Sequence, residues 1–276
     1  LLPERLHIYG FSRSEWTDAQ LKEHVIDSLK GNRKWIDEKK AATFAEYFSY
    51  IIGNAKDPES FKMLRQRIDE VENSWGICSN KLFYFSVPPT LFITIAKNLA
   101  SVKLNIPCST LTGWTQLLIE KPFGSDYQSA KELDSFLLNL YKEKQIFRID
   151  HYLDKEVNQN IIAFRFSNSI FEPSWDGAHV ESIHLRLLET LGVEKRGAFF
   201  DEVGALRDVG ANHLLQILAL LTMERPESLK AEDIRTKRQE LFEQISILDK
   251  EQIKTKTRRG QYKGFRSIEG VNDDSQ

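Results

Sequence analysis

The sequence predicts an α/β fold, in which the remainder of a doubly wound parallel sheet over residues 1–149 precedes the first part of an α+β domain over residues 150–276. Two observations carry this prediction. Apolar strand-like segments alternate with helix-like segments up to about residue 150, as in a parallel α/β sheet. Beyond that point Ser182–Leu187 alternates apolar and polar residues, which is typical of a large, mostly antiparallel sheet with one wet face.

The chain opens with a predicted strand at Arg5–Gly10 and a helix that starts after Thr17. Thr17 and Gln20 form a capping-box pattern at the start of this helix. We expect a second helix over residues 38–52, with Phe44, Phe48 and Ile51 on one face, because these residues follow the helical period.

Proline and glycine mark the ends of several elements that follow. A helix should follow Asp57-Pro58, because proline suits a first helical turn. Leu82–Val87 is nearly all apolar, as expected for a strand that is buried on both faces. The remaining predicted elements of this half are a helix at 90–98, a strand at 116–120, a helix at 129–143 and a strand at 146–149.

In the second half we expect a helix at about Tyr152–Asn160 before the alternating segment. Lys254, Lys256, Arg258 and Arg259 form a local basic run, which we interpret as an exposed strand edge or hairpin, because lysine and threonine alternate there.

Composition excludes several classes of protein. The formal net charge is −2 with mixed signs, so no nucleic-acid partner is expected. Cys78 and Cys108 lie in no CxxC motif and near no histidine cluster, so we expect neither a disulfide framework nor a metal site, and a reducing, cytoplasmic setting. The longest apolar stretches, such as Leu214–Leu221, are too short to span a bilayer, so no membrane partner is expected.

A doubly wound sheet of the Rossmann type normally carries a GxGxxG turn that holds a dinucleotide. This sequence contains no GxGxxG. Two explanations stay open: the first strand, turn and helix lie upstream of Leu1, or the sheet does not bind a nucleotide. Because the chain starts at Leu1 and stops on a polar stretch, we expect both of its ends to continue.

The segment Arg148–Glu156 could bind an anion. His151 and Lys155 are four residues apart and would share one face of a helix, and Tyr152 would add a hydroxyl group. These donors suit a phosphate monoester. The alternative interpretation is an ordinary charged helix start.

His213 lies just before a strongly apolar helical segment. A histidine at such a place can be a core or capping residue. It can also be a base, if a carboxylate holds one ring nitrogen while the other takes a proton from a hydroxyl group. Asp150 is a candidate for that carboxylate, although sequence alone does not show that the two residues meet.

Six segments, in family order, resemble the glucose-6-phosphate dehydrogenase family, and the resemblance covers essentially the whole chain. The match to the active-site signature at Arg148–Glu156 is the most specific. The six segments are Gly10–Ser14, Pro88–Thr90, Glu120–Gly124, Arg148–Glu156, Arg196-Gly197 with Asp201-Glu202, and Asp208 with Asn212–Gln216.

The resemblance implies an oxidoreductase of the oxidative pentose phosphate pathway. It would oxidise glucose 6-phosphate to 6-phosphogluconolactone with hydride transfer to NADP, with NAD also possible. His213 would be the general base and Asp150 would orient it. His151, Tyr152 and Lys155 would hold the 6-phosphate.

Further site residues are implied in the same way. The implied contacts to the sugar hydroxyls are Lys121, Glu189 and Asp208. The implied cofactor contacts are Arg13, Ser14, Glu120, Lys121 and Pro122. Arg13 resembles the residue that meets the 2′-phosphate, which favours NADP over NAD. No metal is implied, and the family commonly forms homodimers or homotetramers.

The chain departs from the family pattern at Asp154, where the family usually has glycine, and at Ala211, which replaces a common glutamine. An inward-facing Asp154 would repel a phosphate, whereas an outward-facing one would be harmless. A non-catalytic sugar-phosphate-binding homologue is the alternative to an enzyme.

Overall fold

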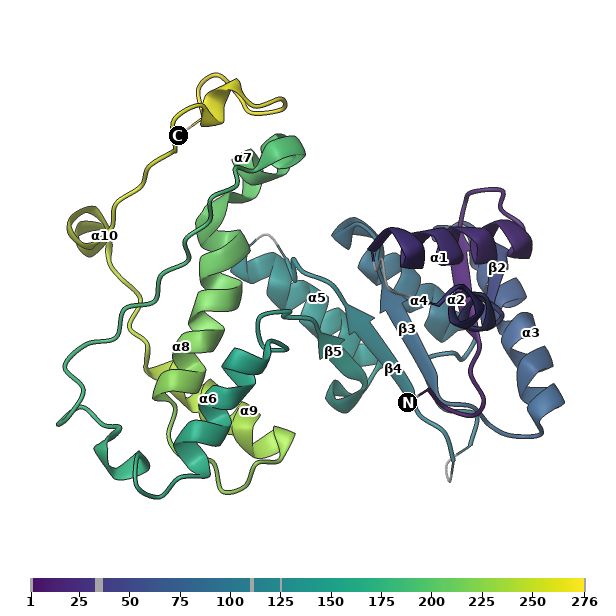
Figure 1. Cartoon of the computed structure of the whole chain (residues 1–276), viewed down its shortest axis with the longest axis horizontal. Helices are drawn as coiled ribbons and strands as arrows, with labels where there is room; N and C mark the ends of the chain where they lie inside the picture. The colour runs from purple at the N-terminus through teal and green to yellow at the C-terminus, as the bar shows by residue number, and fades with distance from the viewer. Residues whose placement is uncertain (1, 33–36, 110–111, 125, 276) are drawn as a thin grey trace. The chain divides into compact units, whose positions relative to one another are not determined.

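The computed structural model describes residues 2–32, 37–109, 112–124 and 126–275. The chain divides into two compact units, Leu1–Ile149 and Asp150–Gln276, which are described separately (Figure 1). None of the described helices is long and apolar enough to cross a bilayer.

The first unit has the predicted alternation of strands and helices, and all of its strand pairs are parallel. Its five strands are β1 (Ile8–Ser12), β2 (Phe48–Ile52), β3 (Lys81–Phe85), β4 (Thr115–Ile119) and β5 (Ile146–Arg148). Its helices are α1 (Asp18–Asn32), α2 (Glu38–Ala45), α3 (Pro58–Trp75), α4 (Phe92–Ser101) and α5 (Tyr127–Leu140), with short 3₁₀ turns η1 (Pro89–Leu91) and η2 (Glu143–Gln145).

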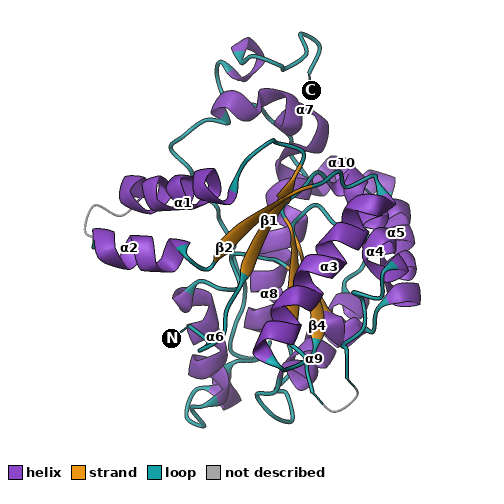
Figure 2. Ribbon diagram, turned by 90° about the vertical axis from the view of Figure 1, so that its right-hand side faces the viewer, coloured by secondary structure: helices purple, strands orange, loops and turns teal. Residues whose placement is uncertain are grey.

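The strands form two sheets, β1–β2 and β3–β4–β5. Ile8 pairs with Phe48 in the first sheet and Leu117 with Ile146 in the second. Helices α1 and α2 lie on one side of the β1–β2 pair and α3 lies on the other (Figure 2). This is the Rossmann-like, doubly wound arrangement that the sequence predicts.

Local signals set the helix ends as expected. The Thr17 backbone N–H donates to Gln20 Oε1 over 2.8 Å, and Gln20 N–H donates back to Thr17 Oγ1. Asp57 caps the start of α3, with Pro58 in its first turn, and Gly76 caps its end with a φ of 66°, which suits a residue without a side chain.

Between the strands and helices of this unit lies its main core. It is rich in aromatic and branched side chains, and Phe92, Leu104 and Leu117 are fully buried. The expectation that Leu82–Val87 is buried on both faces is wrong, because Leu82 and Tyr84 each keep about half of their surface exposed, at 53% and 54%.

The predicted helix over residues 38–52 is also wrong. Helix α2 ends at Ala45, and Phe48–Ile52 is strand β2. The run Phe48-Ser49-Tyr50-Ile51-Ile52 is rich in aromatic and β-branched residues, which suit a strand. Pairing with β1 satisfies the backbone hydrogen-bonding groups of this run, and so favours the strand over the helix.

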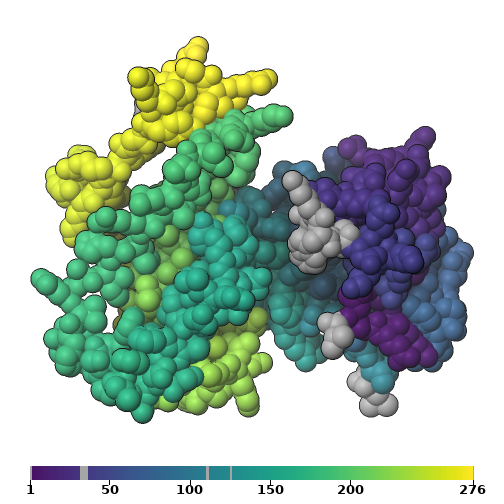
Figure 3. Space-filling view, viewed as in Figure 1, coloured from purple at the N-terminus to yellow at the C-terminus, as the bar shows by residue number. Residues whose placement is uncertain are grey.

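The second unit is helical in its described residues. Its elements are α6 (Glu156–Phe166), α7 (Gly197–Ala205), the π-helix η5 (Leu206–Leu214), α8 (Leu215–Thr222), α9 (Ala231–Gln244) and α10 (Lys250–Lys256), with 3₁₀ turns η3 (Glu172–Ser174), η4 (Glu194–Arg196) and η6 (Phe265–Ser267). A small core forms around Phe166, Leu220 and Met223. The C-terminal segment, yellow in Figure 3, lies against α7, where Asn272 Nδ2 donates to Asp201 Oδ2 over 2.6 Å.

Two strand predictions fail in this unit. Ser182–Leu187 is extended but belongs to no sheet among the described residues, because an isolated alternating segment has no neighbouring strand to pair with. The antiparallel sheet expected for residues 150–276 is accordingly not seen in the described part of the chain. The basic run at Lys254–Arg259 is not a strand edge either, since Lys254 and Lys256 belong to α10, which a capping box at Asp249 starts.

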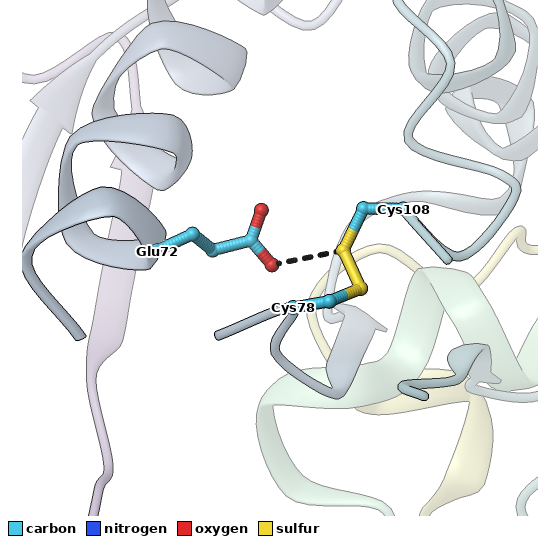
Figure 4. A group of neighbouring side chains, drawn as sticks. All are labelled: Glu72, Cys78 and Cys108. Carbon is cyan, nitrogen blue, oxygen red and sulfur yellow. Dashed lines mark hydrogen bonds between the residues drawn. A yellow bond between two sulfur atoms is a disulfide. The ribbon is translucent and has the colours of Figure 1, made fainter. Parts of the chain in front are cut away.

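The expectation that the two cysteines form no disulfide is also wrong. Cys78 and Cys108 form a disulfide, with their Cα atoms 5.8 Å apart (Figure 4). Thirty positions separate them in the sequence, so no local motif marks the pair. They meet because Cys78 lies just before β3 and Cys108 lies in the loop before β4, and these two strands are neighbours.

Candidate functional site

A buried acid–base pair lies at the centre of the candidate site in the second unit. His213 Nδ1 and Asp150 Oδ1 are 2.7 Å apart, and His213 is only 2% exposed. The Tyr152 backbone N–H donates to the same Asp150 oxygen over 3.0 Å, which fixes the carboxylate. A carboxylate at Nδ1 selects the tautomer whose Nε2 can accept a proton.

Backbone geometry places His213 in an unusual helical segment. Helix α7 contains a break at Gly204, whose φ is 71°, and the chain then continues as the π-helix η5, which carries both Asp208 and His213. π-helical turns are rare and occur frequently at functional sites. The apolar helix α8 follows and anchors this segment through the buried Ala219 and Leu220.

Aromatic and basic side chains surround the imidazole of His213. The Tyr152 ring stacks on it with centroids 4.2 Å apart and planes 17° apart, and the His151 ring meets it edge-on at 4.6 Å. Lys155 Nζ lies 3.8 Å from the centroid of the Tyr152 ring. The three residues with an expected phosphate-binding role therefore cluster at the expected base.

The backbone that brings these residues together is not the helix predicted from the sequence. Residues 151–154 form a turn, and α6 begins only at Glu156 with Lys155 as its N-cap residue. His151 and Lys155 therefore do not share a helix face. They are brought together by the stacked rings of Tyr152 and His213.

Acidic residues lie around the same cluster. Asp208 is buried and its Oδ2 lies 3.5 Å from Nη2 of Arg196. Burial raises the pKa of Tyr152, and the negative charges of Glu189, Asp150 and Asp208 raise it further. Glu189 itself is exposed in the extended segment. The Tyr152 hydroxyl therefore stays protonated near neutral pH and can donate a hydrogen bond.

Asp154, which departs from the family pattern, is exposed. Its backbone carbonyl accepts a long hydrogen bond of 3.4 Å from Gln159 Nε2.

Two arginines near the site were not singled out as site residues from the sequence. Arg196 pairs with Asp208. Arg238, on α9, is held in an environment where burial lowers the pKa of its guanidinium while the charge of Asp150 opposes that effect. Its Nε is buried and has no hydrogen-bond partner among the described residues. Arg196 lies in one of the six segments that resemble the family, whereas Arg238 lies in none of them.

The candidate cofactor residues lie in the first unit, at the carboxyl ends of strands. Arg13 and Ser14 follow β1 and are exposed, and Glu120 follows β4, where it accepts a hydrogen bond of 2.7 Å from the Tyr84 hydroxyl. Lys121 and Pro122 come next, joined by a cis peptide bond. In open α/β sheets ligands bind at these strand ends.

The chemistry of these donors fits a nicotinamide dinucleotide in part. The exposed guanidinium of Arg13, after β1, suits a phosphate monoester. After β4, Glu120 offers a hydrogen-bond acceptor and Lys121 offers a cation. The glycine-rich turn that would hold a pyrophosphate has no counterpart in the described residues.

Comparison with known proteins identifies the family. Residues 1–160 match the model of the glucose-6-phosphate dehydrogenase NAD binding domain, and residues 162–276 match the C-terminal domain of the same family. The chain is 36% identical over its whole length to glucose-6-phosphate 1-dehydrogenase 6, cytoplasmic, of Arabidopsis thaliana. It is 40% identical over 95% of its length to glucose-6-phosphate 1-dehydrogenase of Leuconostoc mesenteroides.

Solved structures agree with this result. The chain superimposes with a TM-score of 0.84 on glucose-6-phosphate 1-dehydrogenase from Mycobacterium avium, with 34% identity over 98% of this chain and 56% of that one. A glucose-6-phosphate dehydrogenase in complex with its substrate glucose-6-phosphate gives a TM-score of 0.85 at 33% identity, again over 98% and 56% of the two chains. The chain spans about half the length of the curated relatives, 53% and 52% of the two named above. Two family models that together match almost every residue, on a fold with the same geometry, show that this chain belongs to the glucose-6-phosphate dehydrogenase family.

Proposed function

We propose that the protein oxidises glucose 6-phosphate to 6-phosphogluconolactone, with NADP as the hydride acceptor. The buried Asp150–His213 pair carries this proposal, because it lies beside His151, Tyr152 and Lys155, which are suited to a phosphate monoester. The match to both family domains and the relatives' names support the assignment.

In the proposed reaction His213 takes the proton from the anomeric hydroxyl of the sugar while hydride leaves the same carbon. Asp150 then stabilises the imidazolium that forms. The nicotinamide, when bound, supplies the hydride acceptor. The cationic cluster fixes the phosphate, and this remote binding energy orients the reacting carbon.

The other predicted residues take their roles in the same scheme. Lys121, Glu189 and Asp208 would contact the sugar hydroxyls. Glu120, Lys121 and Pro122 would border the nicotinamide, while Arg13 and Ser14 would bind the adenosine 2′-phosphate and so favour NADP over NAD. Residues 1–149 would form the coenzyme domain, and residues 150–276 would form part of the substrate and dimerisation domain.

The proposal also covers the oligomeric state of the protein and its cellular compartment. We infer a homodimer or homotetramer in the cytoplasm, with no nucleic-acid or membrane partner. The assembly is what the resemblance to the family implies, and the cytoplasmic relative from Arabidopsis thaliana supports the location. Light scattering coupled to gel filtration measures the assembly, and a monomeric mass at micromolar concentration would contradict it.

The decisive experiment measures glucose-6-phosphate-dependent reduction of NADP, and separately of NAD, by the full-length protein. Activity that is greater with NADP supports the proposal, and activity that is equal or greater with NAD removes the role of Arg13. Binding of the sugar phosphate without any turnover, in a protein of verified fold, would favour the non-catalytic alternative.

A further inference from the structure

Arg238 lies on the face of α9 that packs against the turn carrying Asp150. Ile234, four residues earlier, packs on the small core of the second unit, and so does Leu153. The Leu153 backbone N–H donates to the Asp150 carbonyl over 3.0 Å, so these two residues belong to one turn. Because residues four apart share a helix face, Arg238 lies on the same face of α9 as Ile234.

The guanidinium of Arg238 is partly buried, and its charge faces that of Asp150. Burial lowers the pKa of Arg238, while the negative charge of Asp150 raises it and the exposed Arg235 lowers it. An arginine nevertheless keeps its proton in proteins. A permanent positive charge therefore lies close enough to Asp150 for the two charges to attract each other.

Hydrogen bonding does not explain a charged side chain at this place. Arg238 Nε is inaccessible to solvent and has no hydrogen-bond partner among the described residues. A buried donor without an acceptor destabilises a fold, so an apolar side chain of similar length would suit this packing better. What the guanidinium supplies, and an apolar side chain would not, is a fixed positive charge near Asp150.

That charge matters because Asp150 acts directly on His213. Asp150 Oδ1 lies 2.7 Å from His213 Nδ1, and the two side chains are only 12% and 2% exposed. A negative charge this close, with so little water to screen it, favours a protonated imidazole. A protonated imidazole cannot take a further proton, so it cannot act as a base.

We propose that Arg238 is a positioning residue for the base: its positive charge offsets the negative charge of Asp150 and so favours the neutral imidazole of His213. This role rests on the proposed function, in which His213 must be neutral before it takes the proton of the anomeric hydroxyl. Arg238 acts through Asp150 and not on the sugar itself.

Other titratable and charged groups also lie around His213, and the test leaves them in place. They are His151, Tyr152, Lys155, Glu189, Arg196 and Asp208. Their contributions are the same in wild type and in a variant at Arg238. A difference between the two pH profiles therefore reports the charge of Arg238.

The test measures the pH profile of kcat in the full-length protein and in Arg238→Met, which keeps a similar stem and removes the charge. We expect the limb that reports the base to move to higher pH by about half a pH unit to one pH unit, because nothing on α9 then offsets Asp150. Well above that limb, kcat should stay within about threefold of wild type, since the imidazole is neutral there in both proteins. Arg238→Lys should restore most of the wild-type profile.

Arg235→Met is the matched control, because it removes the same charge from an exposed position of the same helix. Its limb should move less than half as far as that of Arg238→Met, since solvent screens exposed charges. An unshifted limb in Arg238→Met would overturn the proposal. An equal shift in Arg235→Met would overturn it too, because the effect would then belong to the net charge of α9.

A second measurement does not depend on turnover. The His213 imidazole is titrated by NMR in full-length protein without sugar or cofactor, and its signal is assigned by its loss in His213→Asn. A higher midpoint in Arg238→Met than in wild type supports the proposal, even if the wild-type protein shows no turnover and the proposed function fails. An unchanged midpoint overturns it. If Arg238→Met does not fold, Arg238→Gln, which keeps hydrogen-bonding groups without the charge, should shift the midpoint in the same direction.

Discussion

Two buried acid–base pairs, one from each unit, have nearly the same length. Glu72 Oε1 and Lys81 Nζ are 2.6 Å apart in the first unit, and Asp150 Oδ1 and His213 Nδ1 are 2.7 Å apart in the second. Burial and distance do not distinguish the two pairs. They differ in the type of the basic partner, which is a lysine in the first pair and a histidine in the second.

The ammonium group of a lysine keeps its proton near neutral pH, whereas an imidazole gains and loses one there. Burial alone would raise the pKa of Glu72, but hydrogen bonds from Lys81 and Ser79 outweigh it and hold that pKa below its ordinary value. The type of base therefore separates the two pairs, since an imidazole is the residue type suited to general base catalysis and an ammonium group is suited to an ion pair.

Of the substitutions proposed, His213→Asn should give the largest effect. A small effect would contradict the distinction drawn between the two buried pairs. Without the base, turnover of glucose 6-phosphate in the full-length protein should fall by roughly 10⁴-fold, while KM changes little. Steady-state kinetics measures both quantities. His184→Asn, at an exposed position in the same unit, is the control and should be near wild type. Unchanged turnover in His213→Asn would remove it as the base.

Glu72→Gln tests the structural pair. It leaves the Lys81 charge buried without its partner, so the free energy of unfolding should fall by about 3–5 kcal/mol. Urea unfolding of the full-length protein, followed by a probe in the first unit, measures this loss. The matched control Glu70→Gln lies on the exposed side of the same helix and should change stability by less than about 1 kcal/mol. Equal losses in the two variants would show that the pair contributes no more than a surface contact.

Asp150→Asn tests whether the charge of Asp150 supports the proposed role of His213. An amide keeps the size of the side chain but does not stabilise an imidazolium, so turnover should fall by about 10²-fold, which corresponds to about 2.7 kcal/mol. The pH profile of kcat gives a readout that a purely structural role would not move. In Asp150→Asn we expect the limb that reports the base to shift to lower pH, because the amide lacks the negative charge that stabilises a protonated imidazole. An unshifted limb in Asp150→Asn would exclude this electrostatic role.

The smallest expected effect is the pH dependence of the first pair. The pKa of Glu72 is lowered on folding, so the carboxylate stabilises the folded state above its ordinary value of 4.5, and this contribution is lost as pH falls through the lower folded value. The stability difference between wild type and Glu72→Gln should therefore be full at pH 7 and shrink below about pH 4.5. A difference that stays constant down to pH 3 would contradict the assigned direction.

Much of the first unit follows from local sequence. Proline and capping residues mark the start of α3. The short apolar runs at β3 and β4 are typical of strands. The helix predicted at the second strand is wrong, because Phe44, Phe48 and Ile51 also satisfy a helical period. Only its pairing with β1 distinguishes the two.

In the second unit the residues of the site could be listed from their resemblance to a family, but their arrangement could not. Tyr152 stacks on His213 through a turn, where the spacing of His151 and Lys155 had indicated a helix. The alternating segment Ser182–Leu187 had indicated a strand, and it has no strand partner in the described residues.

By itself the sequence determined the strands and helices of the first unit apart from β2, and the resemblance to the family. These depend on short-range patterns, in which caps, prolines and apolar periods act within a few positions. The tertiary structure alone decided that Asp150 meets His213 across 63 positions, and that Cys78 meets Cys108 across 30. Contacts at such separations are made when neighbouring elements pack, and no local pattern encodes which side chains then face one another.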